Sequence, residues 1–398
     1  MRQCRKNNNA NVLRMGIIGL GMAGSMMIDY LGKFENIRLT AAADLNEDHL
    51  KAFAKRFQAE TYKNVTELCR SPNVDAVYIA TPNQYHCEHA LTAAVHGKHI
   101  IVEKPISVTL DEADRMIEAA ERYGIQLCVC HKRSADPPIR KMREIADSGK
   151  LGNLKMIHNW HYNDWLYRPR TMEELKGGGV VLRQGAHQFD MIRYIGGGLV
   201  KSVRADAGVW DETRIAEGSY TAFLEFENGM LATSIYNGYG HFMSLELTYN
   251  IGADGQLVDI GQYYQKRKQL DEKRKMGKET EVKQAAGFTG NKTERKEPEE
   301  QKRPPFFGLT VVSCDRGDIR QSPTGLYVYD KEGVTEIPLD LRFTGLEFII
   351  NEFYESVFFG RRLIHDGRWG KANLELCLAV LESSKKKQEV YLSHQVGI

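Results

Sequence analysis

The sequence has no long run of apolar residues, few cysteines and almost no excess of either charge. Its 398 residues contain no stretch near the roughly 18 consecutive apolar residues that a membrane-spanning helix needs. The beginning of the chain, Met1–Arg14, is basic and rich in asparagine, and it lacks the apolar middle of a signal peptide. We therefore expect a cytoplasmic protein that has no membrane partner.

Seven cysteines are scattered along the chain, and an odd number in a chain of this length indicates reduced thiols rather than a disulfide framework. Cys128 and Cys130 precede His131, which suggests metal ligands, but no second cluster with zinc spacing completes a set of four. The apolar run 125–130 instead predicts a buried strand, so we expect no metal site.

The charge balance is 54 Lys and Arg against 52 Asp and Glu, a net charge of +2. With 42% apolar and 27% charged residues, the chain is typical of a globular protein of roughly two domains. Residues 261–305 carry 13 basic and 8 acidic residues. Because acids are interleaved there and only Tyr263, Tyr264 and Phe288 could stack on bases, we expect a solvated insertion or a lid, and no nucleic-acid partner.

From Val12 to about Cys130, short β-branched runs alternate with amphipathic helical stretches, which is typical of a parallel sheet built from βαβ units. Strands are expected over residues 14–18, 37–43, 76–80, 99–102 and 126–130. Thr109, with Glu112 three residues later, predicts a capping box at the start of a helix that ends at Gly124.

Beyond Leu151 long alternating runs predict an antiparallel sheet with one covered face. Its strands are expected over residues 154–162, 201–209, 219–226, 230–236, 244–251, 309–313 and 325–329, with a hairpin turn at 227–229. Gly177, Gly178 and Gly179 lead into a helix from Val180 to about Ile195. Two more helices, about 345–359 and 371–386, close the chain.

The first motif that carries chemistry is the glycine-rich turn Gly19-Leu20-Gly21-Met22-Ala23-Gly24, between a predicted strand and a predicted helix. A tight turn without a ligand is the alternative, but Asp44 follows Gly24 at the distance expected for a dinucleotide-binding turn. The candidate cofactor contacts are Gly19, Gly21, Met22, Ala23, Gly24 and Asp44. Asp44 would accept hydrogen bonds from ribose hydroxyls and repel a 2′-phosphate, which favours NAD. NADP stays open, since a basic residue could enter from another loop.

Two further loops follow predicted strands, at the sheet edge where ligands bind in doubly wound folds. The loop Ala80-Thr81-Pro82-Asn83-Gln84-Tyr85-His86 could equally be an ordinary turn. In Val102-Glu103-Lys104-Pro105, Lys104 can donate to a substrate oxygen, and partial burial would lower its pKa toward use as an acid or base. An ion pair with Glu103 is the alternative for this lysine.

A fourth motif, Arg183, His187 and Asp190, follows the three glycines. In a helix, Arg183 and His187 would share a face, with Asp190 near the same stripe. His187 is then a candidate general base, and Arg183 is a candidate clamp for a carboxylate. A buried hydrogen bond between His187 and Asp190 is the structural alternative.

These motifs, in this order and spacing, resemble those of the Gfo/Idh/MocA family, the relatives of glucose-fructose oxidoreductase and inositol dehydrogenase. Glu103-Lys104-Pro105 is the most specific element. The resemblance implies a Rossmann dinucleotide-binding domain and an open-faced, mainly antiparallel sheet domain that forms a homodimer or homotetramer, thus α/β plus α+β. The implied parts are a flexible tail 1–14, the domains 15–133 and 134–369, and a C-terminal helix within 370–398 that returns to the first domain.

The resemblance assigns Lys104 as the catalytic lysine and His187 as its partner at the substrate. It places Ala80, Thr81, Pro82, Asn83, His86 and Glu103 beside the cofactor. Most members carry Asp where this chain has Arg183, so the usual Lys-Asp-His set is incomplete here. Arg183 shifts the expected substrate from a neutral polyol toward an anion.

Asn163-Asp164-Trp165 and Tyr167-Arg168-Pro169-Arg170, with residues 177–190, are similar to the phthalate 4,5-cis-dihydrodiol dehydrogenase branch. Trp165, Arg168 and Arg170 are therefore candidate substrate contacts, although both arginines could be surface residues. We expect an NAD-dependent dehydrogenase that oxidises a secondary alcohol on a ring, with a carboxylated cis-dihydrodiol as substrate and a catechol as product. The alternatives are a sugar, inositol or sugar-acid dehydrogenase, and an NAD-dependent glycoside hydrolase or non-catalytic cofactor sensor.

Overall fold

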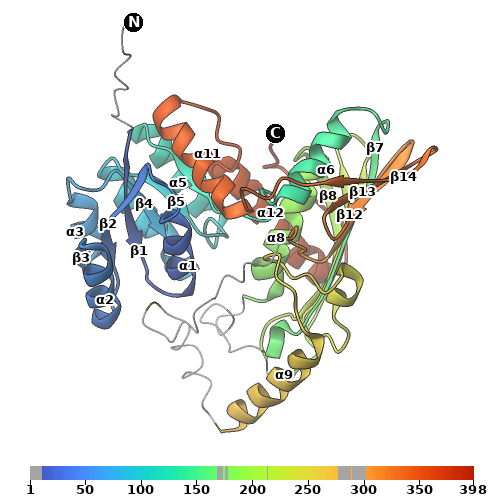
Figure 1. The fold of residues 1–398 in the computed structure, drawn as a ribbon, viewed down its shortest axis with the longest axis horizontal. Helices are drawn as coiled ribbons and strands as arrows, with labels where there is room; N and C mark the ends of the chain where they lie inside the picture. Colours follow the sequence, from blue (N-terminus) through green and yellow to red (C-terminus); the bar gives the residue numbers. More distant parts are fainter. Residues whose placement is uncertain (1–10, 168–173, 175–177, 213, 277–287, 289–301) are drawn as a thin grey trace, which may run out of the picture.

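Two sheets, one in each half of the chain, form two lobes that the C-terminal helices join (Figure 1). The computed structural model describes residues 11–167, 174, 178–212, 214–276, 288 and 302–398. In that part of the chain, no helix is long and apolar enough to cross a membrane.

The first lobe is a six-stranded parallel sheet with the strand order β3-β2-β1-β4-β5-β6, which confirms the predicted doubly wound fold. Its elements are β1 (Leu13–Ile18), α1 (Met22–Leu31), β2 (Ile37–Ala43), α2 (Glu47–Phe57), β3 (Glu60–Tyr62), α3 (Val65–Arg70), β4 (Ala76–Ile79), α4 (His86–Val95), β5 (His99–Val102), α5 (Leu110–Tyr123) and β6 (Leu127–Val129). The strand order reverses between β1 and β4, which places the ligand edge beside the glycine-rich turn.

Two details of this lobe differ from the expectations. Leu13 and Arg14 pair with β2, and the Tyr354 hydroxyl donates to the Asn11 carbonyl oxygen at 2.6 Å, so the expected tail 1–14 is too long. The Thr109 side chain caps α5 as predicted, by accepting a hydrogen bond from the Glu112 N–H. The Glu112 carboxylate, however, accepts from the Val108 N–H, one residue before the N-cap.

The second lobe is a nine-stranded sheet with the order β14-β13-β12-β11-β7-β10-β9-β8-β15. Its strands are β7 (Leu154–Tyr162), β8 (Val200–Gly208), β9 (Ser219–Phe226), β10 (Leu231–Asn237), β11 (Leu309–Cys314), β12 (Gly317–Gln321), β13 (Gly325–Asp330), β14 (Gly333–Pro338) and β15 (Val390–Tyr391). Neighbouring strands are antiparallel except β7 and β10, which run parallel. The helices α6 (Pro137–Asp147) and α8 (Ala186–Gly196) share an apolar core with this sheet.

The strand predicted over residues 244–251 is wrong. Residues Ser244–Thr248 form a short 3-10 helix, and Tyr249 and Asn250 have positive φ angles, which a strand does not allow. The Ser244 hydroxyl donates to the Tyr162 carbonyl oxygen at 3.2 Å, and the Thr248 hydroxyl donates to backbone oxygens nearby. Side-chain hydrogen bonds to the backbone thus replace the ladder that the alternating pattern predicted.

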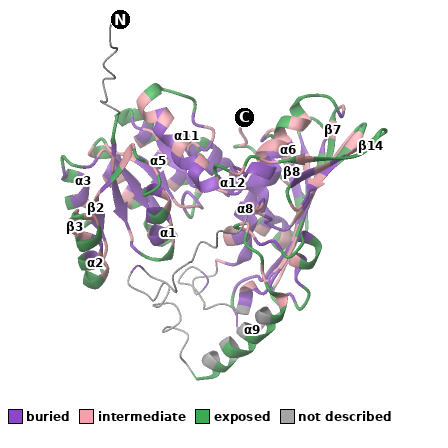
Figure 2. Cartoon of the chain, in the orientation of Figure 1, coloured by how far each residue is buried: buried purple, intermediate pink, exposed green. Residues whose placement is uncertain are grey.

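Two C-terminal helices connect the lobes. Helix α11 (Gly345–Phe359) begins with the Thr344 and Glu347 capping box and packs beside α1 on the parallel sheet. Helix α12 (Gly367–Lys386) begins four residues earlier than predicted, because the Asp366 side chain caps it through the Trp369 N–H. Figure 2 shows α8 and α12 as largely buried elements where the lobes meet, so α12 belongs to the core of the molecule.

The charged insertion contributes helix α9 (Ile260–Lys275), which is exposed where described (Figure 2). Residues 277–287 and 289–301 lie outside the described residues. Phe288 corrects the expectation of a wholly solvated segment, because it is only 9% exposed. Its N–H donates to the Leu20 carbonyl oxygen at 3.3 Å, and its ring lies 6.0 Å from that of Phe53. One residue of the insertion therefore packs into the first lobe beside the glycine-rich turn.

Candidate active site

The glycine-rich turn between β1 and α1 leaves space for a phosphate group. Gly19 has a φ of +96°, and a Cβ built on it would lie 2.9 Å from the Ala80 carbonyl oxygen. A Cβ on Gly24 would lie 2.0 Å from the Gly19 carbonyl oxygen, so α1 packs directly on the turn. A Cβ on Gly21, by contrast, would meet no atom within 4 Å. The turn therefore fits a pyrophosphate that approaches the backbone at Gly21.

The two other candidates of this motif, Met22 and Ala23, form the first turn of α1. Backbone N–H groups in a first helical turn have no partner within the helix, and Gly21 at the N-cap offers no side-chain acceptor. These N–H groups and the positive end of the helix dipole are suited to bind an anion.

Asp44 lies at the end of β2 and faces the same turn. One carboxylate oxygen accepts a hydrogen bond from the Leu20 N–H at 2.5 Å, and the other accepts from the Asn46 N–H at 2.7 Å. Because each oxygen has a second lone pair, the carboxylate retains acceptors for ribose hydroxyls. The neighbouring Leu45 side chain is 90% exposed and carries no charge, so this position adds nothing to hold a 2′-phosphate.

The loop after β4 lies at the ligand edge, and His86 holds it there. The His86 ring is fully buried, with Nδ1 2.9 Å from the Pro105 carbonyl oxygen and Nε2 2.9 Å from the Thr81 carbonyl oxygen. This geometry favours a positioning role for His86 over the direct cofactor contact expected from the sequence. Pro82 is exposed and Asn83 is half-buried, so both keep accessible surface at this edge.

Glu103 and Lys104 follow β5, but their charged groups do not form the pair considered as an alternative. The Tyr78 hydroxyl donates to one Glu103 carboxylate oxygen at 2.5 Å, and the Lys104 N–H donates to the other at 3.1 Å. The Lys104 ammonium instead donates to the Arg183 carbonyl oxygen at 2.8 Å. The Lys104 side chain therefore forms a hydrogen bond between the first lobe and the second.

The surroundings of Lys104 change its acid-base behaviour. The pKa of its ammonium is lowered to about 8, chiefly by burial; the positive Arg183 and Lys132 side chains add to this lowering, and the nearby Glu103 carboxylate opposes it. An amine with a pKa of about 8 is partly neutral near physiological pH, so it can accept a proton from a substrate. The predicted lowering of its pKa is thus present in the structure.

The backbone around Arg183 and His187 is not the single regular helix predicted. Val181–Gly185 forms a π-helical turn, and α8 begins only at Ala186. The Glu217 carboxylate accepts a hydrogen bond from the Val181 N–H at 3.0 Å, and a Cβ on Gly179 would clash with that carboxylate. π-helical turns are frequent at functional sites, and this one presents the Arg183 carbonyl oxygen to Lys104.

His187 lies in a buried and positively charged environment. Burial lowers its pKa well below the usual value, and the charges of Lys104, Arg133 and Lys132 lower it further. Its ring contacts the edge of Phe307, with 5.1 Å between ring centroids, and its Nδ1 has no hydrogen-bond partner in the part of the chain that the structure describes. His187 is therefore a neutral imidazole near pH 7.

Arg183 and Trp165 form a second pair of site residues. The guanidinium carbon of Arg183 lies 5.4 Å from the centre of the Trp165 ring, within range of a cation-π contact. Trp165 belongs to a short 3-10 helix, Trp165–Tyr167, that follows β7. Arg168 and Arg170 lie outside the described residues.

Lys132 and Arg133 were missed by the sequence analysis. Arg133 Nη2 donates to an Asp254 carboxylate oxygen at 2.9 Å, and Lys132 Nζ lies 3.5 Å from the same oxygen. The Arg133 guanidinium carbon also lies 5.3 Å from the centre of the Phe307 ring. The sequence carried a signal for them, because two adjacent basic residues stand one residue after a predicted strand at the ligand edge.

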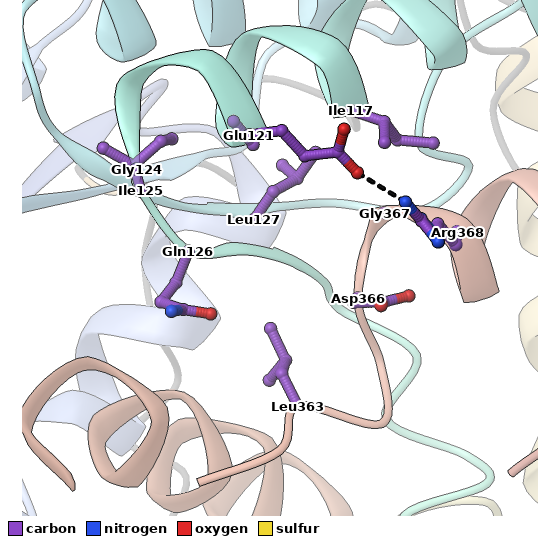
Figure 3. Close-up of a pocket in the computed structure, with 11 residues that line it drawn as sticks. Ile117, Glu121, Gly124, Ile125, Gln126, Leu127, Leu363, Asp366, Gly367 and Arg368 are labelled. Atoms are coloured by element: carbon purple, nitrogen blue, oxygen red, sulfur yellow. Dashed lines mark hydrogen bonds and ion pairs between the residues drawn. The ribbon is translucent and has the colours of Figure 1, made fainter. Parts of the chain in front are cut away.

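One surface pocket of about 310 Å³ lies apart from these residues, between α5, β6 and the start of α12 (Figure 3). Arg368 pairs there with Glu121 at 2.6 Å. None of its lining residues is a site candidate, so the pocket is separate from the candidate active site.

The cysteines fit the expectation of unpaired thiols. Cys69, Cys87, Cys128, Cys130, Cys314 and Cys377 are free. Cys128 lies in β6 and is fully buried, as the strand prediction required. Across the described ranges no group of three or more His, Cys, Asp or Glu side chains is arranged to hold a metal ion.

Comparison with known proteins agrees with this geometry. Residues 13–131 match the oxidoreductase family with an NAD-binding Rossmann fold, and residues 139–251 match the GFO/IDH/MocA C-terminal domain. A 1-carboxy-3-chloro-3,4-dihydroxycyclohexa-1,5-diene dehydrogenase from Comamonas testosteroni is 34% identical over 94% of this chain and 95% of its own. A myo-inositol 2-dehydrogenase from Thermotoga maritima is 31% identical over 55% of this chain and 66% of its own.

Solved structures show the same architecture. A protein from Bordetella bronchiseptica RB50 named as a dehydrogenase superposes with a TM-score of 0.87 at 38% identity, covering 96% of this chain and all of its own. An Agrobacterium radiobacter oxidoreductase crystallised with NAD+, L-tartaric acid and magnesium has a TM-score of 0.70 at 18% identity, over 95% of this chain and 98% of its own, which bears on the fold alone. The chain thus belongs to the Gfo/Idh/MocA family of NAD-binding oxidoreductases.

Proposed function

We propose that this NAD-dependent dehydrogenase oxidises a secondary alcohol on a ring that carries a carboxylate, with a cis-dihydrodiol as substrate and a catechol as product. One observation carries the proposal. The charged groups that most strongly perturb His187, namely Lys104, Arg133 and Lys132, are all positive, and Arg183 lies on the same turn. Asp254 pairs with Lys132 and Arg133, and the surplus of basic side chains that remains around His187 favours an anionic substrate. The similarity to the Comamonas dehydrogenase, which is named for a carboxylated dihydroxycyclohexadiene, agrees with this charge argument.

The chain's own residues supply the proton chemistry. A neutral Lys104 amine that donates one N–H to the Arg183 carbonyl oxygen keeps its lone pair for the hydroxyl proton of the substrate. Neutral His187 orients that hydroxyl oxygen. When bound, NAD supplies the nicotinamide that accepts the carbinol hydrogen as a hydride. The resulting ketone enolises to the catechol, and aromatisation draws the reaction forward.

Arg183 replaces the carboxylate that most relatives carry at this position, so we assign it to substrate binding rather than proton transfer. Its planar guanidinium can hold a carboxylate through two parallel hydrogen bonds. The face of Trp165 supports the guanidinium and restricts its orientation. Arg168 and Arg170 stay as further candidates for the same anion.

Asp44, the glycine-rich turn and the loop 80–83 are assigned to the cofactor. The Asp44 carboxylate and the uncharged Leu45 favour NAD over NADP, since neither attracts a 2′-phosphate. Glu103, whose carboxylate accepts hydrogen bonds from the Tyr78 hydroxyl and the Lys104 backbone N–H, is assigned to hold the backbone at Lys104 in place.

A homodimer or homotetramer is proposed through the uncovered face of the nine-stranded sheet. Met156 and Trp160 on β7, Phe223 on β9 and Leu231 on β10 are 37–46% exposed, and Leu231 pairs with Met156 in the strand register. Apolar side chains gathered on one sheet face are typical of an interface. We also propose a cytoplasmic location, which agrees with the free thiols.

The proposal is tested by following NADH absorbance with purified protein, NAD and a substrate panel. Phthalate cis-dihydrodiol and benzene cis-dihydrodiol form the matched pair, because they differ in their carboxylates; inositols, hexoses and their acids complete the panel. Preferential turnover of the carboxylated dihydrodiol supports the proposal. Turnover of sugars or inositols alone would replace it with the family's polyol chemistry. Bound cofactor without any NADH formation would favour a glycoside hydrolase or a sensor.

A further inference from the structure

A buried carboxylate that the catalytic scheme does not use lies three residues after His187. Asp190 on α8 is fully buried, and its two oxygens accept hydrogen bonds from groups other than His187, contrary to the structural alternative considered from the sequence. One of its oxygens accepts a hydrogen bond from Trp369 Nε1 at 2.8 Å. The other accepts from the Ser134 N–H at 3.2 Å. Both oxygens therefore bind donors from distant parts of the chain.

The two donors come from two separate parts of the chain that meet at α8. Ser134 lies in the segment that follows β6 of the first lobe, and Trp369 lies on the first turn of α12. The same end of α8 is held by Asn373, whose side-chain amide donates to the Ala186 carbonyl oxygen at 2.8 Å. The contact from Lys104 to Arg183 lies one turn earlier. These polar contacts link α8, and with it His187, to the first lobe and to α12.

His131 completes the surroundings of this carboxylate. Its Nδ1 lies 3.8 Å from an Asp190 oxygen, and within the described chain neither ring nitrogen has a hydrogen-bond partner. The pKa of His131 is lowered to about 4, chiefly by burial; His365, Arg193 and Lys104 add to this lowering, and Asp190 opposes it. His131 is therefore neutral at pH 7, and its Nδ1 lies too far from Asp190 for a hydrogen bond, so the Asp190 oxygens stay with Ser134 and Trp369.

We propose that Asp190 is a positioning residue that holds α8 against the segment after β6 and against α12, and thereby sets the distance between His187 on the second lobe and Lys104 on the first. Two hydrogen bonds to a buried carboxylate are strong and directional, since both partners are removed from water. Loss of one leaves a buried donor unsatisfied, and α8 would relax away from the first lobe. The inference rests on the roles proposed for Lys104 and His187.

The test uses Asp190→Asn, which keeps size and shape but replaces one acceptor with a donor. Glu375→Gln is the matched control, because Glu375 is a buried carboxylate on α12 whose partners are Ser393, His394 and Gln395 of the C-terminal segment. Three quantities are measured in the full chain: the melting temperature, the Kd for NADH by fluorescence, and the Lys104 pKa by NMR after reductive ¹³C-methylation. The Lys104 pKa can be measured without substrate, so the inference can be tested even if the proposed reaction is wrong.

The sign of the change in the Lys104 pKa separates positioning from a simple charge effect. Removing a negative charge alone would lower that pKa. If α8 moves away, the burial and the positive Arg183 that depress the Lys104 pKa diminish, so the pKa should rise toward its ordinary value in Asp190→Asn and stay unchanged in Glu375→Gln. We expect kcat to fall at least tenfold on whichever substrate the panel identifies, while the Kd for NADH changes less than twofold.

Two outcomes would overturn the proposal. One is a folded Asp190→Asn protein whose Lys104 pKa is unchanged or lower. The other is a fall in melting temperature equal to that of Glu375→Gln with no difference in the Lys104 pKa, which would leave Asp190 a purely structural group. Should Asp190→Asn fail to fold, Trp369→Phe removes one donor to Asp190 and keeps an aromatic ring, and the same criteria apply to it.

Discussion

The Lys104 ammonium and the Arg183 carbonyl oxygen form a 2.8 Å hydrogen bond between residues 79 positions apart. Lys104 stands at the carboxyl end of β5 in the first lobe, and Arg183 lies in the π-helical turn before α8 in the second. The contact orients the amine while leaving its lone pair available. It also places the Arg183 side chain, stacked on Trp165, at the same site.

The first prediction concerns pH. Lys104 must be neutral to accept a proton, and its pKa is about 8, so kcat for alcohol oxidation should rise with pH through about 8 and reach a plateau above it. Steady-state kinetics between pH 6 and 10 measure this. Lys104→Ala should lose about 10²-fold or more in kcat and lose the inflection; a Lys104→Ala enzyme with the same profile as the parent would exclude this lysine as the base.

The second prediction concerns substrate charge. Arg183→Gln should raise KM for a carboxylated substrate by about 10- to 100-fold, because a charge-assisted hydrogen bond is lost, and kcat should change less. The KM for the matched substrate without a carboxylate should stay within about twofold. Equal losses on both substrates would show that Arg183 serves the turn structure rather than the anion.

The third prediction concerns cofactor choice. Asp44→Ala should weaken NAD binding by about tenfold, close to 1.4 kcal/mol, and weaken NADP binding less, because a carboxylate that repels the 2′-phosphate is removed. Asp44→Asn serves as the control, since its amide oxygen can still accept the Leu20 N–H. Fluorescence titration with NADH and NADPH compares the variants, and an unchanged ratio of the two affinities would refute the assignment.

The fourth prediction concerns the insertion. Phe288→Ala should lower the free energy of unfolding by about 1–3 kcal/mol, since a ring packed on Phe53 is lost. NAD binding should weaken a few-fold, because without the packed ring the backbone N–H of residue 288 is no longer held against the Leu20 carbonyl oxygen. Tyr264→Ala is the control: its ring is 49% exposed on α9 and its hydroxyl makes an exposed hydrogen bond to the His241 carbonyl oxygen, so it should lower the free energy of unfolding less than Phe288→Ala and leave NAD binding unchanged. Urea unfolding and NADH titration that fail to separate the two variants would contradict the packing seen here.

The fifth prediction concerns acid stability. His131 is neutral in the folded protein down to a pKa of about 4, whereas in the unfolded chain it takes up a proton near pH 6.5. The unfolded state binds more protons in between, so stability should fall as pH decreases from about 6.5 to 4, by on the order of 1–3 kcal/mol. His365 acts in the opposite direction on stability. Burial lowers its pKa, but the Glu352 carboxylate raises it, and the pKa of His365 is raised overall.

A variant isolates the contribution of His131. His131→Gln removes the titrating group and should reduce the loss of stability between pH 7 and 4.5, measured by urea unfolding. Part of the pH dependence of stability should remain in this variant, because the pKa of His187 is also lowered. A pH dependence identical to that of the parent would mean that His131 is not the group that becomes charged on unfolding.

Local patterns determined much of this protein. The spacing from the glycine-rich turn to Asp44, the positions of Glu103 and Lys104 after a strand, and the capping residues Thr109 and Gly124 each depend on backbone dihedral angles or burial that a short segment encodes. Alternating and helical periodicities likewise identified most strands, since each side chain must face either the core or solvent. The family followed from these motifs and their order.

Tertiary structure decided the rest. The π-helical turn depends on Glu217, which binds the Val181 N–H from 36 residues away, and no periodicity in residues 180–195 encodes that partner. The parallel pairing of β7 with β10 and the burial of Phe288 beside Leu20 are likewise contacts between distant segments. Asp190 could not be assigned from the sequence, because its partners Ser134 and Trp369 lie 56 and 179 residues away. The sequence determines which polar groups must form hydrogen bonds when they are buried. The tertiary structure determines which groups come close enough to form them.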